Sequence, residues 1–203
     1  MRFRDIYILS ISILVLLSAC QNSNEKSLDI GDGGLLSGEP CSAPCFWNII
    51  PSVTTEKQAQ DIISTKLNLK NCNYWDTRDS GGTRGLRCSN LGVTFNDLDI
   101  VNMVSYQPST VITVNEVIRK YGAPDGVSIG ILGIEMTPPL SMRLYFDQIG
   151  MIISLPEQNS VTYNLQPETS VKSIGYFEQS EYNFSKSSAQ IWKGFGEYLY
   201  DEK

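Results

Sequence analysis

The sequence predicts an α+β fold in which an antiparallel sheet has helices packed on one face, with a further helix at the C-terminus. Two helix-opening segments, each with a proline followed by a threonine, begin about 57 residues apart, and β-favouring segments follow both of them. The composition is 41% hydrophobic and 10% aromatic, which is typical of a chain that folds around a packed core. Two tandem helix–β-meander repeats are one arrangement consistent with this recurrence.

The first half of the domain, residues 47–107, is expected to hold one helix and a hairpin. Thr55 and Gln58 have the spacing of a capping box, and the apolar residues that follow share one face of a helix from about 55 to 67. Alternating residues on both sides of the turn-forming pair Asn96-Asp97 predict a hairpin within 84–107.

The second half, residues 108–155, follows the same order. Thr113 and Glu116 form a second capping box, and three strands are expected near 127–134, 141–147 and 150–155.

The remaining residues, 156–203, form a C-terminal extension of the same single domain, which spans 41–203. A last strand is expected at 171–177. The aromatic stripe within 187–199 predicts the terminal helix, packed on the sheet.

The N-terminus has the pattern of an export signal. Arg2 and Arg4 precede an apolar stretch of about a dozen residues, which is too short to span a bilayer and ends in small residues. The ending Leu17-Ser18-Ala19-Cys20 resembles the lipobox of bacterial lipoproteins. This resemblance implies that residues 1–19 are a signal peptide and that Cys20 carries a diacylglyceryl group and a further acyl chain such as palmitate.

The resemblance also implies a location on the extracytoplasmic side of the cell membrane or outer membrane, with the bilayer as one partner through Cys20. Residues 20–40 are polar and glycine-rich, and they are expected to act as a flexible tether. Removal of the leader would leave 14 basic and 21 acidic residues, a net charge of −7. Such a balance argues against nucleic acid as a partner.

Four further cysteines are even in number and belong to an exported chain, so disulfides are expected. Pairing of Cys41 with Cys45 and of Cys72 with Cys88 is favoured, and the crossed arrangement remains an alternative. The second bridge would close a loop of about 15 residues, worth roughly 3 kcal/mol in the chain-entropy view.

The chain contains no histidine, which excludes Ser-His-Asp and Cys-His catalysis and every metal site that needs imidazole. The Gly-x-Ser-x-Gly pattern at 126–130 therefore leaves Ser128 without a base. Asp97 and Asp99, with Glu135, are the carboxylates on which a hydrolase reading would depend, but turn chemistry accounts more simply for the first two. No catalytic residue, metal or cofactor is predicted.

Four aromatic residues lie close to the cysteines in the sequence: Phe46, Trp47, Tyr74 and Trp75. They are candidates for a surface that binds a partner, although aromatic residues beside disulfides more often pack in the interior.

The segment Thr113-Val114-Asn115-Glu116-Val117-Ile118, with Tyr121-Gly122-Ala123-Pro124, resembles the turn–helix–Gly-x-Pro segment of small bacterial envelope lipoproteins of the BamE/SmpA type. A tandem version of that unit occurs in β-lactamase-inhibitor-like proteins. The resemblance implies the helix-then-meander fold, and the first half departs from it because no Gly-x-Pro follows Leu67. Similarity of fold alone implies neither outer-membrane assembly nor lactamase inhibition for this chain.

Together these features predict a membrane-anchored, non-enzymatic module that binds or supports a protein of the cell envelope or of the extracellular space. An inhibitor or immunity-type module that blocks an enzyme is one alternative. A carboxylate-dependent glycan hydrolase is the other.

Overall fold

The computed structural model describes residues 28–69, 72–133 and 139–200. Three α-helices lie in these ranges: α2 (Glu56–Thr65), α3 (Val114–Tyr121) and α4 (Gln179–Lys186). The strands are β1 (Asn73–Asp76), β2 (Arg84–Cys88), β3 (Leu91–Phe95), β4 (Val101–Tyr106), β5 (Gly126–Ile131), β6 (Leu140–Phe146), β7 (Met151–Ser154), β8 (Thr162–Leu165), β9 (Ser173–Phe177) and β10 (Gly196–Leu199). The predicted α+β class is confirmed.

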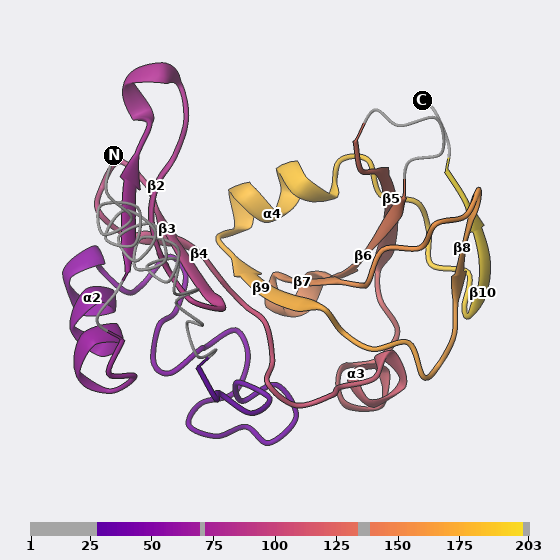
Figure 1. Cartoon of the computed structure of the whole chain (residues 1–203), viewed down its shortest axis with the longest axis horizontal. Coiled ribbons are helices and arrows are strands. Elements are labelled where there is room, and N and C mark those ends of the chain that lie inside the picture. The colour runs from indigo at the N-terminus through magenta and orange to yellow at the C-terminus, as the bar shows by residue number, and fades with distance from the viewer. Residues whose placement is uncertain (1–27, 70–71, 134–138, 201–203) are drawn as a thin grey trace, which may run out of the picture.

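Eight of the strands form one antiparallel sheet in the order β1-β2-β3-β4-β9-β7-β6-β5 (Figure 1). Helix α2 precedes the first four strands along the chain, and α3 precedes β5, β6 and β7. Strand β9 returns after an excursion through β8 and inserts between β4 and β7. The sheet is therefore continuous across both halves of the chain, with the β4–β9 pair as the seam.

Both predicted capping boxes are present and set the starts of α2 and α3. Thr55 accepts a hydrogen bond from the Gln58 backbone, and the Gln58 side chain accepts one from the Thr55 backbone. Thr113 and Glu116 form the same reciprocal pair at α3. These caps satisfy donors that a helix start leaves without an intrahelical partner.

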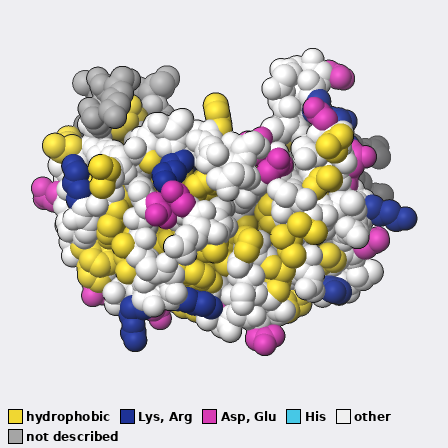
Figure 2. All heavy atoms as spheres, turned by 180° about the vertical axis from the view of Figure 1, so that it is seen from behind, with side chains coloured by type: hydrophobic (Ala, Val, Ile, Leu, Met, Phe, Trp, Pro, Cys, Tyr) yellow, Lys and Arg dark blue, Asp and Glu magenta, His cyan; other side chains and the backbone are white. Residues whose placement is uncertain are grey.

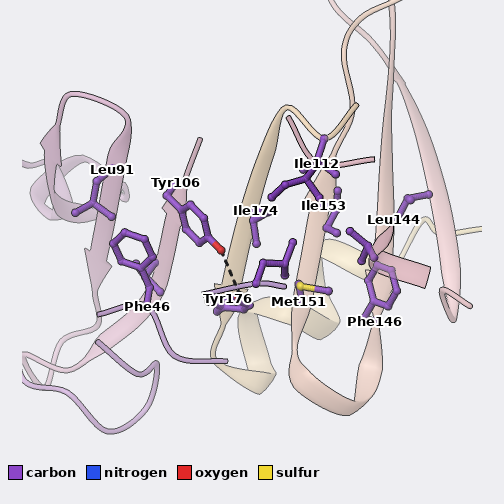
Figure 3. Packing of buried hydrophobic residues seen from close by; sticks show 14 of the residues in the cluster. Phe46, Leu91, Tyr106, Ile112, Leu144, Phe146, Met151, Ile153, Ile174 and Tyr176 are labelled. Carbon is purple, nitrogen blue, oxygen red and sulfur yellow. Dashed lines mark hydrogen bonds between the residues drawn. The ribbon is translucent and has the colours of Figure 1, made fainter. Parts of the chain in front are cut away.

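The main core lies between the sheet and the helices α2 and α3. Alternation along the strands sends one set of side chains to this face, among them Val104, Tyr106, Ile174, Tyr176 and Ile153, which are fully or almost fully buried (Figure 3). Tyr106 stacks on Phe46 with ring centroids 4.4 Å apart. The phenol oxygens of Tyr106 and Tyr176 are 3.4 Å apart, so the two polar groups have partners inside the core.

Helix α4 packs on the opposite face of the sheet, which corrects the prediction that the helices share one face. Tyr182 of α4 contacts Tyr145 and Ile152, whose neighbours Leu144 and Ile153 point into the main core. Figure 1 shows α4 on the upper side of the sheet and α3 on the lower side. No pattern of apolar residues in the sequence predicts this helix, because Tyr182 is the one residue of α4 that is buried.

The helix expected at 187–199 is also wrong. Ser187 instead ends α4, and residues 196–199 form β10, which pairs with β8 in a second small sheet. Gly194 and Gly196 have φ angles of 95° and 130°, which are incompatible with a helix. The hydroxyl of Tyr198 donates to the Gly194 carbonyl at 2.6 Å and fixes the turn.

Residues 28–40 were expected to belong to a flexible tether, yet they pack against the domain. Leu35 is fully buried, and the hydroxyl of Tyr121 donates to the Leu35 carbonyl at 2.6 Å. The carboxylate of Asp32 accepts bonds from the backbone of Gly34, Leu36 and Ser37. Although burial opposes it, these bonds hold the pKa of Asp32 below its ordinary value. The folded body thus begins no later than residue 28, and the rest of the expected tether, with the leader, lies outside the described residues.

Ile174→Ala tests whether the seam supports the whole sheet. Ile174 is fully buried opposite Tyr106 and Ile153, so the cavity should lower the free energy of unfolding by about 2–5 kcal/mol. Val111→Ala is the control, because Val111 is 82% exposed and its truncation should change stability by less than about 0.5 kcal/mol. Urea unfolding followed by fluorescence and circular dichroism measures both. Two separated transitions, one per half, would contradict a continuous sheet.

Candidate functional site

The face of the sheet opposite α2 and α3 is only partly covered, and it forms a groove between the β1–β2 hairpin and α4. Two adjoining hollows, of about 360 and 260 Å³, share Met103, Ser105 and Ser173 on the seam strands. Figure 2 shows the hairpin as a lobe at the upper right, with the outline hollowed beside it. We define the groove by its principal lining residues: Trp75, Arg87, Gly92, Met103, Ser105, Arg143, Ser154, Ser173, Gly175, Phe177 and Ser185.

Small side chains make the floor of the groove. Strand register places Arg87, Gly92, Ser105 and Gly175 in one row across four strands. The ring of Phe177 lies over Gly175, where a Cβ atom would come within 2.6 Å of it. The ring of Trp75 lies over Gly85 in the same way, and a Cβ atom at Gly85 would come within 2.4 Å of that ring. Glycine at both positions therefore lets flat aromatic side chains lie along the sheet.

Helix α4 forms one wall and is held by a polar cluster on Asp147. Lys186 donates to both carboxylate oxygens of Asp147 at 2.6 Å, and the Tyr182 hydroxyl donates to the same group at 2.7 Å. Burial opposes ionisation, but these donors keep the pKa of Asp147 below its ordinary value. The Tyr145 hydroxyl, in turn, donates to the Ser185 carbonyl at 2.9 Å.

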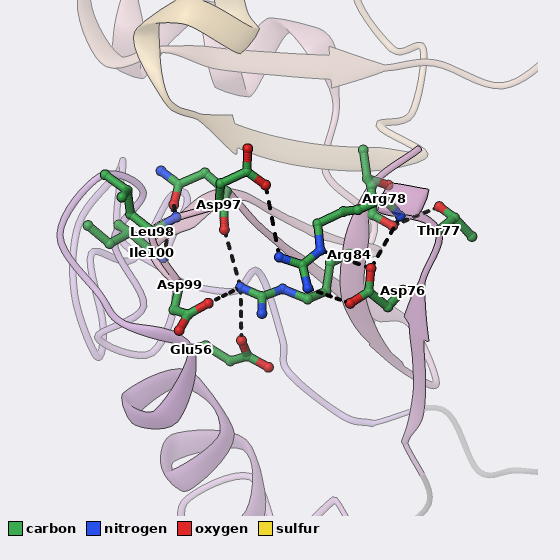
Figure 4. Close-up of polar contacts among 11 residues, drawn as sticks. Glu56, Asp76, Thr77, Arg78, Arg84, Asp97, Leu98, Asp99 and Ile100 are labelled. Atoms are coloured by element: carbon green, nitrogen blue, oxygen red, sulfur yellow. Dashed lines mark hydrogen bonds and ion pairs between the residues drawn. The ribbon is translucent and has the colours of Figure 1, made fainter. Parts of the chain in front are cut away.

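The β1–β2 hairpin forms the other wall, and ion pairs fix the end of its strands next to the loop 77–83 (Figure 4). The buried Arg84 binds Asp99 and lies 3.2 Å from Glu56 at the start of α2. Arg78 at the hairpin tip binds Asp76 at 2.6 Å, and this hydrogen bond lowers the pKa of Asp76 to about 2. The cluster joins the hairpin to α2 and to the β3–β4 turn.

Both favoured disulfides are confirmed, and the crossed alternative is wrong. Cys41 bonds to Cys45, and Cys72 bonds to Cys88. Cys88 is buried at the end of β2, and Cys72 directly precedes β1. The second bridge therefore closes the base of the hairpin at the end opposite Arg78.

The four aromatic candidates do not form one surface. Phe46 lies in the core against Tyr106. Trp47 is half-buried, and its enclosed indole nitrogen has no hydrogen-bond partner among the described residues. Tyr74 and Trp75 are neighbours on β1 and therefore point to opposite faces of the sheet. Trp75 alone lines the groove. Proximity in the sequence to the cysteines was thus a poor guide to the surface.

The catalytic patterns weighed in the sequence fall at structural positions. Ser128 lies within β5, opposite Arg143, and its hydroxyl is 2.9 Å from the Tyr145 hydroxyl. That strand position lacks the strand-to-helix turn that a nucleophile elbow requires. Asp99 binds Arg84, and Asp97, 91% exposed, lies 3.9 Å from Arg78. Asp97 and Asp99 both lie beside arginines, so this pair of carboxylates does not support the hydrolase hypothesis. Glu135 lies outside the described residues.

Within 28–69, 72–133 and 139–200, no group of three or more Cys, Asp or Glu residues is close enough to hold a metal ion. None of the helices in these same ranges is long and apolar enough to cross a bilayer.

No protein-family model, curated protein or solved structure matches this chain.

Sequence reasoning missed Arg87, Arg143, Met103 and the serines of the groove. The signal that brings them together is strand register: Arg143 pairs with Ser154, which pairs with Ser173. That pairing depends on β9 lying between β4 and β7, which are distant from it in the sequence, so no local sequence pattern indicates it.

Asp147→Asn should loosen the α4 wall, because it removes the carboxylate charge that accepts from Lys186 and Tyr182. Asp147 is partly exposed, so an effect of about 1 kcal/mol is expected, seen as roughly fivefold faster amide exchange in Gln179–Lys186. Lowering the pH should also loosen α4. Because the pKa of Asp147 is lower in the folded protein, its ionised carboxylate stabilises the fold at pH values above the unfolded-state pKa. This stabilisation is lost as the pH falls through the folded-state pKa.

Glu157→Gln is the matched control, since it breaks the exposed ion pair with Lys172 outside α4. Hydrogen exchange with mass spectrometry measures both variants. Unchanged exchange in α4 for Asp147→Asn would show that the polar cluster does not hold the wall.

Proposed function

We propose that the protein is a non-enzymatic, membrane-anchored lipoprotein of the cell envelope that binds a partner protein in the groove. The observation that supports this most strongly is a broad sheet face left open between two braced walls. It exposes aromatic, thioether and hydroxyl groups together, and its lining contains no carboxylate. Such mixed surfaces are typical of protein interfaces, whereas small-molecule sites are deeper and more enclosed.

The rigidity of both walls supports a binding role. The disulfide Cys72–Cys88 and the Arg84 ion pairs hold the hairpin, and the Asp147 cluster holds α4. A preorganised surface loses less conformational entropy on association, so a shallow groove can still bind with useful affinity.

The projecting hairpin favours one more specific version of this function, an inhibitor or immunity-type module. Its tip, residues 77–83, extends beyond the sheet and is braced at the base by a disulfide and at the tip by the Arg78–Asp76 pair. A rigid projecting loop of this kind suits insertion into the cleft of an enzyme. The two versions differ in what the partner does once bound.

Anchoring through Cys20 would place the groove near the bilayer. Seven residues separate Cys20 from Leu28, and eight extended steps reach about 28 Å at most. The Leu28 carbonyl accepts from the Asn90 side chain in the β2–β3 turn, and Asn90 also lines the groove. The groove would therefore open within reach of other proteins on the same membrane.

A photo-crosslinking amino acid at Ser105, on the groove floor, should capture a discrete protein partner in the intact envelope of the cells that produce the chain. The same amino acid at Ser64, on the exposed side of α2, is the control and should give no such adduct. Immunoblotting and mass spectrometry detect the adducts. If both positions gave the same adducts, or Ser105 gave none, the groove would not be a protein-binding surface.

Cys20→Ala should abolish acylation and release the protein from membranes. Metabolic labelling with an alkynyl fatty acid and fractionation measure both effects, with Cys41→Ala plus Cys45→Ala as a control that keeps Cys20. Label retained on Cys20→Ala would contradict lipid anchoring at this residue.

A further inference from the structure

We propose that the partner meets the groove with an acidic protein surface, whose carboxylates pair with Arg87 at one end and Arg143 at the other. This inference rests on the proposed protein-binding function and names the chemistry of the partner.

Arg87 lies on β2 at the hairpin end of the groove. Its side chain is exposed, and its guanidinium carbon is 6.0 Å from the centre of the Trp75 ring. Among the described residues, no carboxylate forms an ion pair with it. A guanidinium over an aromatic ring keeps its in-plane donors free for a carboxylate.

Arg143 lies on β6 beside the α4 wall. It is also exposed, and its cross-strand neighbours are Ser128 and Ser154. No ion pair to Arg143 occurs within the described ranges. Both arginines therefore line the groove with no carboxylate partner in the part of the chain that the structure describes.

The charge of the groove lining differs in sign from that of the whole chain. Acidic residues outnumber basic ones by 22 to 16 in the chain, yet the groove lining holds two arginines and no Asp or Glu. Arg78 and Arg84, in the same half of the sheet, are both paired with carboxylates. The lining of the groove is thus positive at both ends on an otherwise acidic protein, and it attracts carboxylates on the surface of a partner.

The spacing of the two charges favours a protein over a small anion or a polyanion. Arg87 and Arg143 lie five strand positions apart, or about 24 Å at roughly 4.8 Å per strand. One phosphate or carboxylate cannot reach both. A nucleic acid would present many phosphates to only two cations and would be repelled by the rest of the surface. A protein surface can place two carboxylates at this distance and lay neutral side chains over Met103 and the serines between them.

The test uses the full-length chain with the photo-crosslinking amino acid at Ser105, in intact envelopes. Arg87→Glu combined with Arg143→Glu should reduce the yield of the Ser105 adduct at least tenfold, whereas Arg87→Lys with Arg143→Lys should retain most of it. Lys57→Glu combined with Lys193→Glu is the matched control, because both lysines are exposed and neither lines the groove. Circular dichroism of each purified variant verifies that the fold is kept.

Mass spectrometry of the adduct then identifies the partner segment, and Asp or Glu codons in it are changed to Arg. Recovery of the adduct when an acidic-to-Arg partner variant meets the Arg87→Glu, Arg143→Glu chain would establish the pairing.

The outcomes separate the two claims. An adduct whose yield is unaffected by the double reversal, or a crosslinked segment without carboxylates, overturns the acidic-partner inference and leaves the binding function standing. An adduct with nucleic acid or lipid in place of protein, or no adduct in the parent chain, overturns both.

Discussion

The antiparallel pairing of β4 with β9 is the interaction on which the rest of the structure depends. Each helix-plus-strands half has an unpaired sheet edge, and neither half buries the seam residues alone. Pairing places Val104 opposite Tyr176 and Tyr106 opposite Ile174, all of them buried. The same contact turns two small sheets into one of eight strands, which removes two edges that would otherwise be exposed to association.

The seam also creates the groove. Met103, Ser105 and Ser173 line both hollows, and all three lie on β4 or β9. Since strand side chains alternate, the residues that fill the core and those that floor the groove are set by one register. A shift of that register by one residue would bury Ser105 and expose Tyr106, so stability and the proposed binding surface cannot vary independently.

Local signals in the sequence predicted much of the fold. The threonine caps of α2 and α3, the alternation in β4–β7 and the disulfide between Cys72 and Cys88 all depend on residues within about 20 positions of one another. The one strand expected before Asn96 is instead divided into β2 and β3, and β1 was not predicted. The prediction of a C-terminal helix is wrong because it rested on the aromatic stripe and gave too little weight to Gly194 and Gly196. The positive φ angles of these two glycines determine the backbone there. The tether was placed too far along the chain because a glycine-rich segment was taken as solvated, yet Leu35 is fully buried.

The groove could not be predicted from the sequence, since it depends on β9 crossing back between β4 and β7 and on α4 covering only part of one face. Hydroxyl-radical footprinting of the chain in intact envelopes and after purification tests directly whether this surface is occupied. Met103 and Trp75 should be oxidised several-fold more slowly in the envelope, while Tyr74, on the other face of β1, should be oxidised at the same rate in both. Equal oxidation of Met103 and Trp75 in the two samples would contradict a groove that binds a protein.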